Sequence, residues 1–374
     1  MHITLVEPFF TGSHRQWALG LQKHSKHEVQ LLTLPGRFWK WRMYGGAVEL
    51  AQQFLNTVKK TDLILATDML DLSTFLALTK SRTANLPVAL YFHENQITYP
   101  WSDTDQDVKL QRHNQYGFIN YTSALSADRL LFNSLYHQKS FLGSLPDFLK
   151  QFPDFRTLQL VPELAQKSQV LPLALDLQQL NVDHLGKKEA QPLILWNHRW
   201  EYDKGPDAFF EALFQLKSEG VSFRLLVLGE AYTKAPAIFK TAQQELSNEI
   251  IHFGYVEDDA QYKSYLHQAD ILLVTSHQDF FGGSVVEAMY CNTFPILPDR
   301  LAYPEHLPES EKTLYFYKEE KDLYPLLKKA VLEIEATRHW ANQLSDKVAH
   351  YDWRSQIDHY DRVVETVKGS YFKK

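Results

Sequence analysis

Short apolar runs recur along the whole chain, each followed by a turn and a stretch with helical periodicity. Such runs are typical of strands buried on both faces, and their alternation with helices indicates a doubly wound parallel sheet. We therefore predict an α/β fold. The predicted strands are residues 3–6, 29–33, 63–66, 88–92 and 130–132 in the first half, and 193–196, 223–228, 250–253, 271–274 and 294–297 in the second.

A stretch without clear periodicity, residues 176–191, separates the two series of strands, and we interpret it as a linker. A chain of 374 residues is also too long for one ordinary hydrophobic core. We therefore predict two Rossmann-like domains, the first over residues 1–180 and the second over residues 181–349.

The composition disfavours several classes of protein. No apolar stretch approaches the roughly 18 residues of a membrane span, and the first residues enter a predicted strand without the features of a secretion signal. The single Cys291 excludes a disulfide framework within the chain. We expect a cytoplasmic protein. Its net charge of -6 does not favour nucleic acid as a partner, although a local basic patch stays open.

Residues 271–287 indicate a strand, a glycine turn and a helix. Gly282, Gly283 and Ser284 precede the helix, and such a turn lets backbone N–H groups approach a phosphate. Glu287 lies about one turn into the helix, where a carboxylate can accept hydrogen bonds from neighbouring hydroxyls such as those of a ribose. The stretch favours a nucleotide site over an ordinary strand-to-helix turn.

A second polar loop follows the predicted strand at 193–196. It carries Arg199 and Lys204, and Pro206 marks a helix start. Two cations there can neutralise a diphosphate and stabilise the charge that develops as it leaves. Solvent-exposed cations on an ordinary loop are the alternative, which we rank second because the glycine turn points to the same ligand.

The loop after the first predicted strand holds Gly12 and Ser13, at the edge of a parallel sheet where ligands bind. The two residues could bring backbone amides near a nucleotide diphosphate or a second substrate. A cap on the following helix explains Ser13 equally well.

Four polar residues follow the strand at 88–92, where catalytic groups of α/β proteins usually lie. His93 could bond a sugar hydroxyl or help an acceptor hydroxyl lose its proton. Its neighbours are candidate acceptor-binding residues: Glu94, Asn95 and Gln96. A structural role for this cluster is the less favoured interpretation.

We expect no metal site. His93 and Glu94 are adjacent rather than one helical turn apart. The triplet Asp103, Thr104 and Asp105 superficially matches a metal-binding acid pair, but it follows a loop rather than a strand, and we interpret it as solvated.

Cations and aromatic rings alternate most densely over residues 35–46. Arg37, Lys40 and Arg42 lie among Phe, Trp and Tyr side chains, a composition that suits a nucleic-acid backbone with stacked bases. A packed loop with solvated cations is about as plausible. Arg112, at a predicted helix start, could line an acceptor cleft or simply belong to the helix end.

Several motifs together resemble one family, the tRNA-queuosine α-mannosyltransferases. They are EPF at 7–9, GSH at 12–14, FHENQ at 92–96 with Tyr99-Pro100, NHRWE at 197–201 and FFGGSVVE at 280–287. In addition, Asp279 and Glu287 stand eight positions apart, which resembles the acid-x7-Glu signature of retaining family-4-type glycosyltransferases. The resemblance covers nearly the whole chain.

The resemblance implies a GT-B fold, in which two Rossmann-like domains face a central cleft and a terminal helix, here residues 350–374, crosses back to the first domain. It implies retaining transfer of mannose from GDP-mannose to a cyclopentene hydroxyl of queuosine in aspartate tRNA, with no cofactor and no obligatory metal. By matching positions, the predicted catalytic residues would be His93 at the reaction centre, Arg199 and Lys204 at the diphosphate and Asp279 beside the donor sugar. The donor would contact Gly12, Ser13, Gly229, Val256, Gly282, Gly283, Ser284 and Glu287.

Two other functions stay open on the sequence. A GT-B transferase with a lipid, polysaccharide or small-molecule acceptor would share every donor residue. A non-catalytic module that binds a nucleotide sugar or RNA is the second alternative. A dehydrogenase is disfavoured, because no G-x-G-x-x-G follows the first strand of either half.

Overall fold

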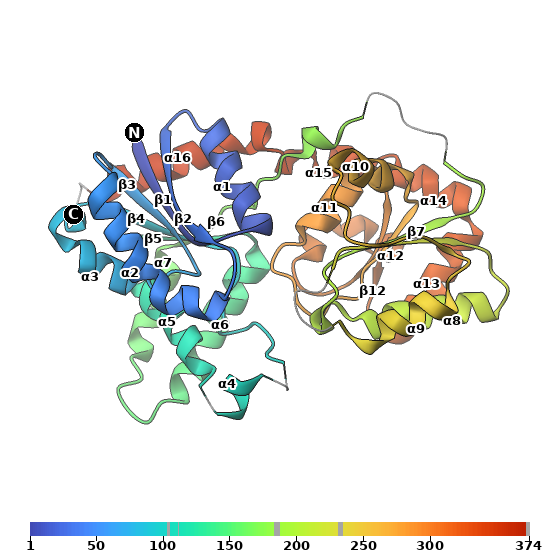
Figure 1. Cartoon of the computed structure of the whole chain (residues 1–374), viewed down its shortest axis with the longest axis horizontal. Coiled ribbons are helices and arrows are strands. Elements are labelled where there is room, and N and C mark those ends of the chain that lie inside the picture. Colours follow the sequence, from blue (N-terminus) through green and yellow to red (C-terminus); the bar gives the residue numbers. More distant parts are fainter. Residues whose placement is uncertain (103–104, 111, 183–187, 231–234, 372–374) are drawn as a thin grey trace. The chain divides into compact units, whose positions relative to one another are not determined.

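The computed structural model describes residues 1–102, 105–110, 112–182, 188–230 and 235–371. The chain separates into two compact units (Figure 1). The first consists of Met1–Leu175 together with Trp353–Lys374, and the second of Asp176–Asp352. Of the predicted linker, residues 183–187 lie outside the described residues.

The first unit is built on a parallel six-stranded sheet with strand order β2-β1-β3-β4-β5-β6. Its central strands β3 and β4 are buried at every position, as their apolar runs predict. The strands are β1 (His2–Phe10), β2 (Glu28–Pro35), β3 (Leu63–Thr67), β4 (Val88–Phe92), β5 (Arg129–Phe132) and β6 (Ser168–Val170). Strand β6 was not predicted from the sequence, because it is a short edge strand whose residues are only half-buried.

The helices of the first unit include one from the far end of the chain, α16 (Trp353–Tyr371). Figure 1 shows this red helix among the blue elements of the unit. The others are α1 (Gly12–His24), α2 (Trp39–Thr57), α3 (Leu72–Thr83), α4 (Gln106–Lys109), α5 (Asn114–Ser126), α6 (Leu135–Lys150) and α7 (Val161–Gln166).

Helix α16 is held by Tyr360, a fully buried residue. The hydroxyl of Tyr360 donates to the Pro172 carbonyl at 2.7 Å and accepts from Trp17 Nε1 at 3.1 Å. Gly20 of α1 lets Trp353 approach, since a Cβ at Gly20 would lie 2.0 Å from the indole nitrogen. The last helix therefore packs against α1 and β4 in the core of the first unit.

The second unit repeats the plan with strand order β12-β11-β10-β7-β8-β9, again all parallel. Its strands are β7 (Leu193–Asn197), β8 (Arg224–Leu228), β9 (Ile250–Gly254), β10 (Ile271–Leu273), β11 (Phe294–Pro298) and β12 (Phe316–Tyr317). Its helices are α8 (Pro206–Ser218), α9 (Ala237–Glu245), α10 (Asp259–Gln268), α11 (Gly283–Tyr290), α12 (Lys312–Tyr315), α13 (Glu320–Leu332), α14 (Ile334–Ala341) and α15 (Leu344–Val348). Two parallel six-stranded sheets confirm the predicted α/β fold class.

Both sheets reverse their strand order at one point, between β1 and β3 in the first and between β7 and β10 in the second. In open α/β sheets the crevice outside the carboxyl ends of the strands at such a switch point is where ligands bind. The topology therefore predicts a ligand site at each of these two switch points. Among the described residues, no helix has the length and apolarity needed to cross a membrane.

Candidate functional site

In the second unit, the loop after β7 is tied to the loop after β10, across the switch point of the sheet. The Thr275 hydroxyl donates to the carbonyls of Lys204 and Gly205, at 2.9 and 2.8 Å. Gly205 has φ +64°, and a Cβ there would lie 2.4 Å from the Thr275 carbonyl oxygen. Only glycine therefore permits this close approach of the two loops. The approach fixes the backbone position of the neighbouring Lys204.

Lys204 is a buried cation on that loop, with 8% of the residue exposed. Its Nζ donates to the Gln278 carbonyl at 2.6 Å and lies 3.3 Å from Asp203 Oδ2 and 3.7 Å from Asp279 Oδ2. Arg199, on the same loop, is largely exposed, and its Nη1 lies 3.4 Å from Glu201 Oε1. One cation is thus held rigidly while the other is accessible to a ligand.

Asp279 is the acid beside Lys204. Its Oδ2 accepts from the Tyr303 hydroxyl at 3.2 Å and its Oδ1 from the Phe281 backbone N–H at 3.3 Å. Burial alone would raise the pKa of Asp279, but the neighbouring charge of Lys204 and these hydrogen bonds hold it below its ordinary value. Asp279 is therefore a carboxylate at neutral pH.

The glycine turn forms the start of α11, as the sequence predicts. Gly282 has φ +87° and caps the helix, and a Cβ there would collide with the Tyr303 ring at 2.9 Å. Gly283 and Ser284 follow in the first turn of the helix, half-buried. The N–H groups at this helix start can receive an anion.

Glu287 lies on α11 within a small buried hydrogen-bond network. Its Oε2 accepts from the Tyr262 hydroxyl at 3.0 Å, and Asn197 Nδ2 donates to the same hydroxyl at 3.0 Å. Burial raises the pKa of Glu287 to about 7. The position of this carboxylate is therefore set by residues from β7 and α10 that the sequence analysis did not select.

His198 is a further buried group at this edge. Its Nδ1 lies 3.4 Å from the Ser284 hydroxyl, while its Nε2 is buried without a hydrogen-bond partner among the described residues. Burial, and then the charge of Lys204, lowers the pKa of His198 to about 4. Buried polar atoms are normally hydrogen-bonded, so a hydrogen bond from a bound ligand would explain the unsatisfied nitrogen of this neutral imidazole.

Gly229 and Val256 are two further residues predicted to contact the donor, and the structure gives a packing reason for the first of them. Gly229 has φ +95° and a Cβ there would lie 2.4 Å from the His198 carbonyl oxygen, so backbone packing alone requires glycine. Val256 follows β9 and is half-buried. Both stay predictions as contacts of a ligand.

In the first unit, His93 follows β4 at the corresponding edge. Its backbone N–H donates to Asp68 Oδ1 at 2.7 Å, and Asn133 Nδ2 donates to its carbonyl at 2.9 Å. Asp68, at the end of β3, is 1% exposed, and burial raises its pKa to about 8. His93 is thus anchored by its backbone to both neighbouring strands.

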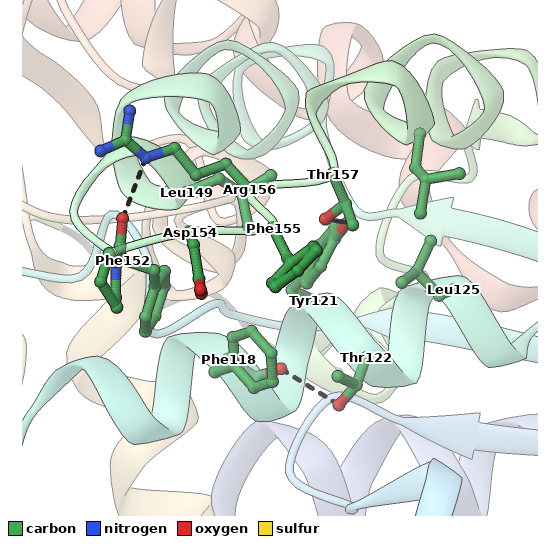
Figure 2. A pocket seen from close by; sticks show the side chains of 12 residues that line it. Phe118, Tyr121, Thr122, Leu125, Leu149, Phe152, Asp154, Phe155, Arg156 and Thr157 are labelled. Carbon is green, nitrogen blue, oxygen red and sulfur yellow. Dashed lines mark hydrogen bonds between the residues drawn. The ribbon is translucent and has the colours of Figure 1, made fainter.

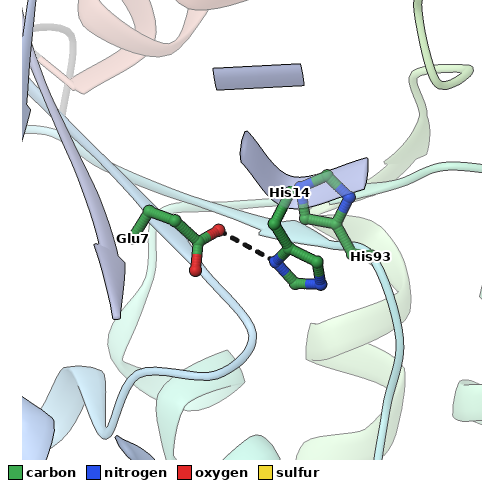
Figure 3. Close-up of side chains that lie close together, drawn as sticks. All are labelled: Glu7, His14 and His93. Atoms are coloured by element: carbon green, nitrogen blue, oxygen red, sulfur yellow. Dashed lines mark hydrogen bonds and ion pairs between the residues drawn. The ribbon is translucent and has the colours of Figure 1, made fainter. Parts of the chain in front are cut away.

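Two residues missed by the sequence analysis, Glu7 and His14, lie beside His93 (Figure 3). His14 Nδ1 is 2.9 Å from Glu7 Oε2, and the His14 and His93 ring centroids are 4.1 Å apart. Glu7 ends up here because its strand β1 is the neighbour of β3 at the switch point. The two residues belong to the EPF and GSH motifs, and these motifs were the sequence signal that could have identified them.

The residues after His93 mostly build the loop. The side chain of Asn95 is fully buried, and its Oδ1 accepts from the backbone N–H groups of Ile97 and Thr98 at 3.1 and 3.0 Å. Gln96 Nε2 donates to Glu94 Oε1 at 2.8 Å. Asn95 therefore shapes the turn, whereas half-buried Glu94 is left accessible to a second substrate.

Gly12 opens helix α1 with φ +49° and open space where a side chain would be. Ser13 lies inside the helix, exposed, and the cap position is Thr11, which makes no side-chain capping bond. The interpretation of Ser13 as the helix cap is therefore wrong. The N–H groups at this uncapped helix start stay candidates for a phosphate.

The segment predicted as a basic aromatic loop is largely the first turns of α2. Lys40 lies among the rings of Trp39, Trp101 and Tyr116 and forms ion pairs with Asp105 and Asp107, at 2.6 and 2.5 Å. Its charge is therefore neutralised within the unit.

The other predicted RNA-contacting cations differ from Lys40. Arg37 is exposed, and Arg42 is half-buried with its Nε donating to the Pro35 carbonyl at 3.0 Å. Arg112 is exposed just before α5. These three side chains stay candidates for RNA contact.

The acidic triplet is only partly described, since Asp103 and Thr104 lie outside the described residues. Asp105 caps α4 through the Asp107 N–H and pairs with Lys40, so its interpretation as a solvated residue is wrong. Within the described part of the chain, Glu7, His14 and His93 form a group whose possible ligand atoms lie within 4.8 Å of one another.

A separate hollow of about 390 Å³ lies between α5 and the segment before α7 (Figure 2). Its lining is mostly apolar and includes Phe118, Phe152 and the highly exposed Phe155. None of the predicted site residues contributes to its lining. The hollow therefore adds nothing to the chemistry of either switch point.

Comparison with known proteins gives two consecutive family matches. Residues 2–175 match a model described as tRNA-queuosine alpha-mannosyltransferase N-terminal, and residues 178–344 match glycosyl transferases group 1. The chain is 33% identical over 317 residues to the tRNA-queuosine alpha-mannosyltransferase of Drosophila melanogaster, covering 82% of each chain. A 2-deoxystreptamine glucosyltransferase of Streptomyces kanamyceticus is 25% identical over 224 residues, 56% of this chain and 55% of that one.

Solved structures with the same fold are distant in sequence. Sucrose-phosphate synthase from Thermosynechococcus elongatus has a TM-score of 0.71 at 14% identity, covering 99% of this chain and 100% of that one. HepE of Anabaena, solved in complex with UDP, has a TM-score of 0.65 at 14% identity, covering 98% and 100%. These likenesses establish the GT-B fold.

Proposed function

The chain belongs to the tRNA-queuosine alpha-mannosyltransferase family, and from that premise we propose that it transfers mannose from GDP-mannose to a cyclopentene hydroxyl of queuosine at the wobble position of aspartate tRNA. The observation that carries the proposal is the family match over residues 2–175, because it falls on the unit to which we assign the acceptor. Such a reaction takes place where tRNA is modified, and we place the protein in the cytoplasm.

The donor contacts in this proposal come from the second unit. Arg199 and Lys204 hold the diphosphate, and the N–H groups of residues 282–284 bind phosphate and sugar oxygens. Glu287 accepts hydrogen bonds from the ribose hydroxyls, and Asp279 lies beside the donor sugar. The distances of Lys204 Nζ to Asp279 and of Glu287 to Tyr262 support this arrangement, because both carboxylates are held in place before a ligand arrives.

The chemical step is departure of the nucleotide diphosphate with retention at the anomeric carbon. The cations lower the barrier by stabilising the negative charge that develops on the leaving diphosphate. The acceptor hydroxyl attacks from the same face, and its proton passes to the leaving diphosphate. His93 contacts that hydroxyl from the first unit. No residue of the described chain is assigned as a covalent nucleophile, and no metal is assigned to the reaction.

The donor and acceptor can be tested together by measuring release of GDP. The protein is incubated with GDP-mannose and either aspartate tRNA carrying queuosine or the same tRNA with guanosine at the wobble position. We expect GDP release only with the queuosine-containing tRNA. Equal release with both tRNAs, or release only from a UDP-sugar, would overturn the proposed substrates.

One alternative function is a GT-B transferase with another acceptor, such as a lipid, a polysaccharide or a small metabolite. It would use the same donor residues and differ only in the first unit. The matched pair of tRNAs separates the two functions, since only the proposed function depends on the modified base. Turnover of any donor excludes the other alternative, a non-catalytic binding module.

The pKa of Glu287 gives a prediction for donor affinity. Burial raises this pKa to about 7, and the carboxylate rather than the acid accepts ribose hydrogen bonds, so GDP affinity is full above pH 7 and is lost as the pH falls below it. The loss approaches about tenfold per pH unit. Calorimetric titration with GDP across this range measures it.

Two variants sharpen this test. Glu287→Gln should remove the pH dependence. Tyr262→Phe removes a hydrogen bond that lowers the pKa of Glu287, so it should move the midpoint upward. An undiminished pH dependence in Glu287→Gln would show that another group is responsible.

Arg37 and Arg42 give a prediction for tRNA binding. If they contact phosphates, replacing both with alanine should weaken tRNA binding and lower its log–log salt slope by about 0.7 to 0.9 per lost contact. Donor affinity should not change. Filter binding at several salt concentrations measures both, with Lys59→Ala/Lys80→Ala as a control for two exposed cations elsewhere on the unit. An equal loss in the control would assign the effect to net charge alone.

A further inference from the structure

Glu7 and His14 form a buried ion pair beside the proposed acceptor site. The Glu7 side chain is fully buried, with Oε1 accepting from the Phe9 N–H at 2.7 Å and Oε2 lying 2.9 Å from His14 Nδ1. His14 is 7% exposed and lies in the first turn of α1. Glu7 therefore fixes both the orientation of the His14 ring and the nitrogen that carries its inner proton.

His93 is packed against the ring of His14. The two ring planes are 34° apart with centroids at 4.1 Å, and the edges of Trp17 and Tyr91 enclose His93 at 4.8 and 4.9 Å. His93 Nε2 is buried and has no hydrogen-bond partner among the described residues. A fixed ring with one unsatisfied nitrogen is prepared to accept a hydrogen bond from a substrate hydroxyl.

A metal ion is the competing explanation for this group. Two His side chains that share an ion point their nitrogens at it from different directions. Here the two rings pack against each other at a tilt of 34° with centroids 4.1 Å apart, and His14 Nδ1 is already engaged with Glu7. The arrangement fits a stacked imidazolium and imidazole better than a coordination sphere.

We propose that His14 is a positioning residue for the transfer: paired with Glu7, it holds a positive charge against the face of His93 and thereby keeps His93 neutral, with Nε2 able to accept the hydrogen bond of the acceptor hydroxyl. A protonated His93 would have no lone pair for that bond. This inference rests on the proposed function only for the identity of the acceptor. The charge relation between the two histidines is a property of the free protein.

The pKa values of the two histidines agree with this assignment. Burial lowers the pKa of His14, but Glu7 more than offsets it and raises the value to about 9. Burial, and then the charge of His14, lowers the pKa of His93 well below its usual range.

The other titratable groups packed around His93 come from four elements. Burial raises the pKa of Asp68 to about 8 and that of Tyr91 well above its usual range, and it lowers the pKa of His137, so these three groups are mostly uncharged at neutral pH. Glu94 is the half-buried acid next to His93 in the chain. Tyr360 of α16, with a pKa of about 12, is also uncharged. His14 is therefore the cation that faces His93 at neutral pH.

The test compares His14→Gln and Glu7→Gln with the wild type by NMR titration of labelled histidines, without substrate. The His93 signal is assigned from its loss in His93→Gln. Removing the neighbouring positive charge makes protonation of His93 easier, so its midpoint should rise in both variants, since Glu7→Gln also lets His14 lose its proton at neutral pH. His24→Gln, on the same helix with its ring against Trp353, is the matched control and should leave the midpoint unchanged.

Activity provides a second readout. With queuosine-containing tRNA, kcat of His14→Gln should fall about tenfold for each pH unit below its raised His93 midpoint, whereas kcat of the wild type should begin to fall only at the lower pH of its own His93 midpoint. A His93 midpoint that stays unchanged in both variants would overturn the proposal. So would one equivalent of bound divalent metal in the wild type that His14→Gln loses. Because the titration needs no substrate, an absence of tRNA modification would refute the proposed function and leave this result readable.

Discussion

Replacing Lys204 with alanine should lower kcat by about 10²- to 10³-fold, the usual cost of removing one preorganised charge from a leaving group. Lys204 Nζ is held by the Gln278 carbonyl at 2.6 Å and has a nearby acid in Asp279, so it is positioned before the donor binds. The loss should exceed that for Arg199→Ala, because exposed Arg199 has further to move. Single-turnover kinetics with GDP-mannose measure the effect on chemistry apart from donor binding.

The control for this prediction is Lys217→Ala, which removes an exposed lysine paired with Glu249 on the same unit. It should leave kcat unchanged. Thermal unfolding of Lys204→Ala is measured alongside, because removing this cation leaves Asp203 and Asp279 with less compensation for burial. A folded Lys204→Ala protein with kcat within about threefold of the wild type would contradict the assignment of Lys204 to the leaving diphosphate.

Replacing His93 with alanine should lower kcat with queuosine-containing tRNA by about 10²-fold or more, within the range for loss of a positioned proton-handling side chain. GDP affinity should stay unchanged, because His93 belongs to the first unit and the proposed donor contacts belong to the second. His93→Asn, which keeps an acceptor of hydrogen bonds, should lose less. Loss of GDP affinity with an unchanged kcat in His93→Ala would contradict the assignment of His93 to the acceptor hydroxyl.

The strands were predictable because the sheets are buried on both faces. Every residue of β3, β4, β7 and β11 is buried, and all of them except Thr67 and Asn197 are apolar, so the strands appear in the sequence as apolar runs. Strand β6 was missed because its Ser168–Val170 segment is a half-buried edge. Strand β12, two residues long, is too short to produce a pattern.

The site residues were predictable where the functional side chains directly follow a single strand or lie within a single turn. Lys204 follows β7, His93 follows β4, and the acid pair Asp279 and Glu287 brackets one glycine turn. Contacts between elements were not accessible in this way. Glu287 meets Tyr262 of α10, and His93 meets His14 of α1, because of the order of strands in each sheet, which the sequence does not display.

The most direct test of the proposed function is the mass of the product nucleoside. The protein is incubated with queuosine-containing aspartate tRNA and GDP-mannose, the tRNA is digested, and the nucleosides are weighed by mass spectrometry. The proposal predicts queuosine heavier by one hexose, and no such product when UDP-glucose replaces GDP-mannose. Unmodified queuosine, with the hexose lost to water or found on another acceptor, would contradict it.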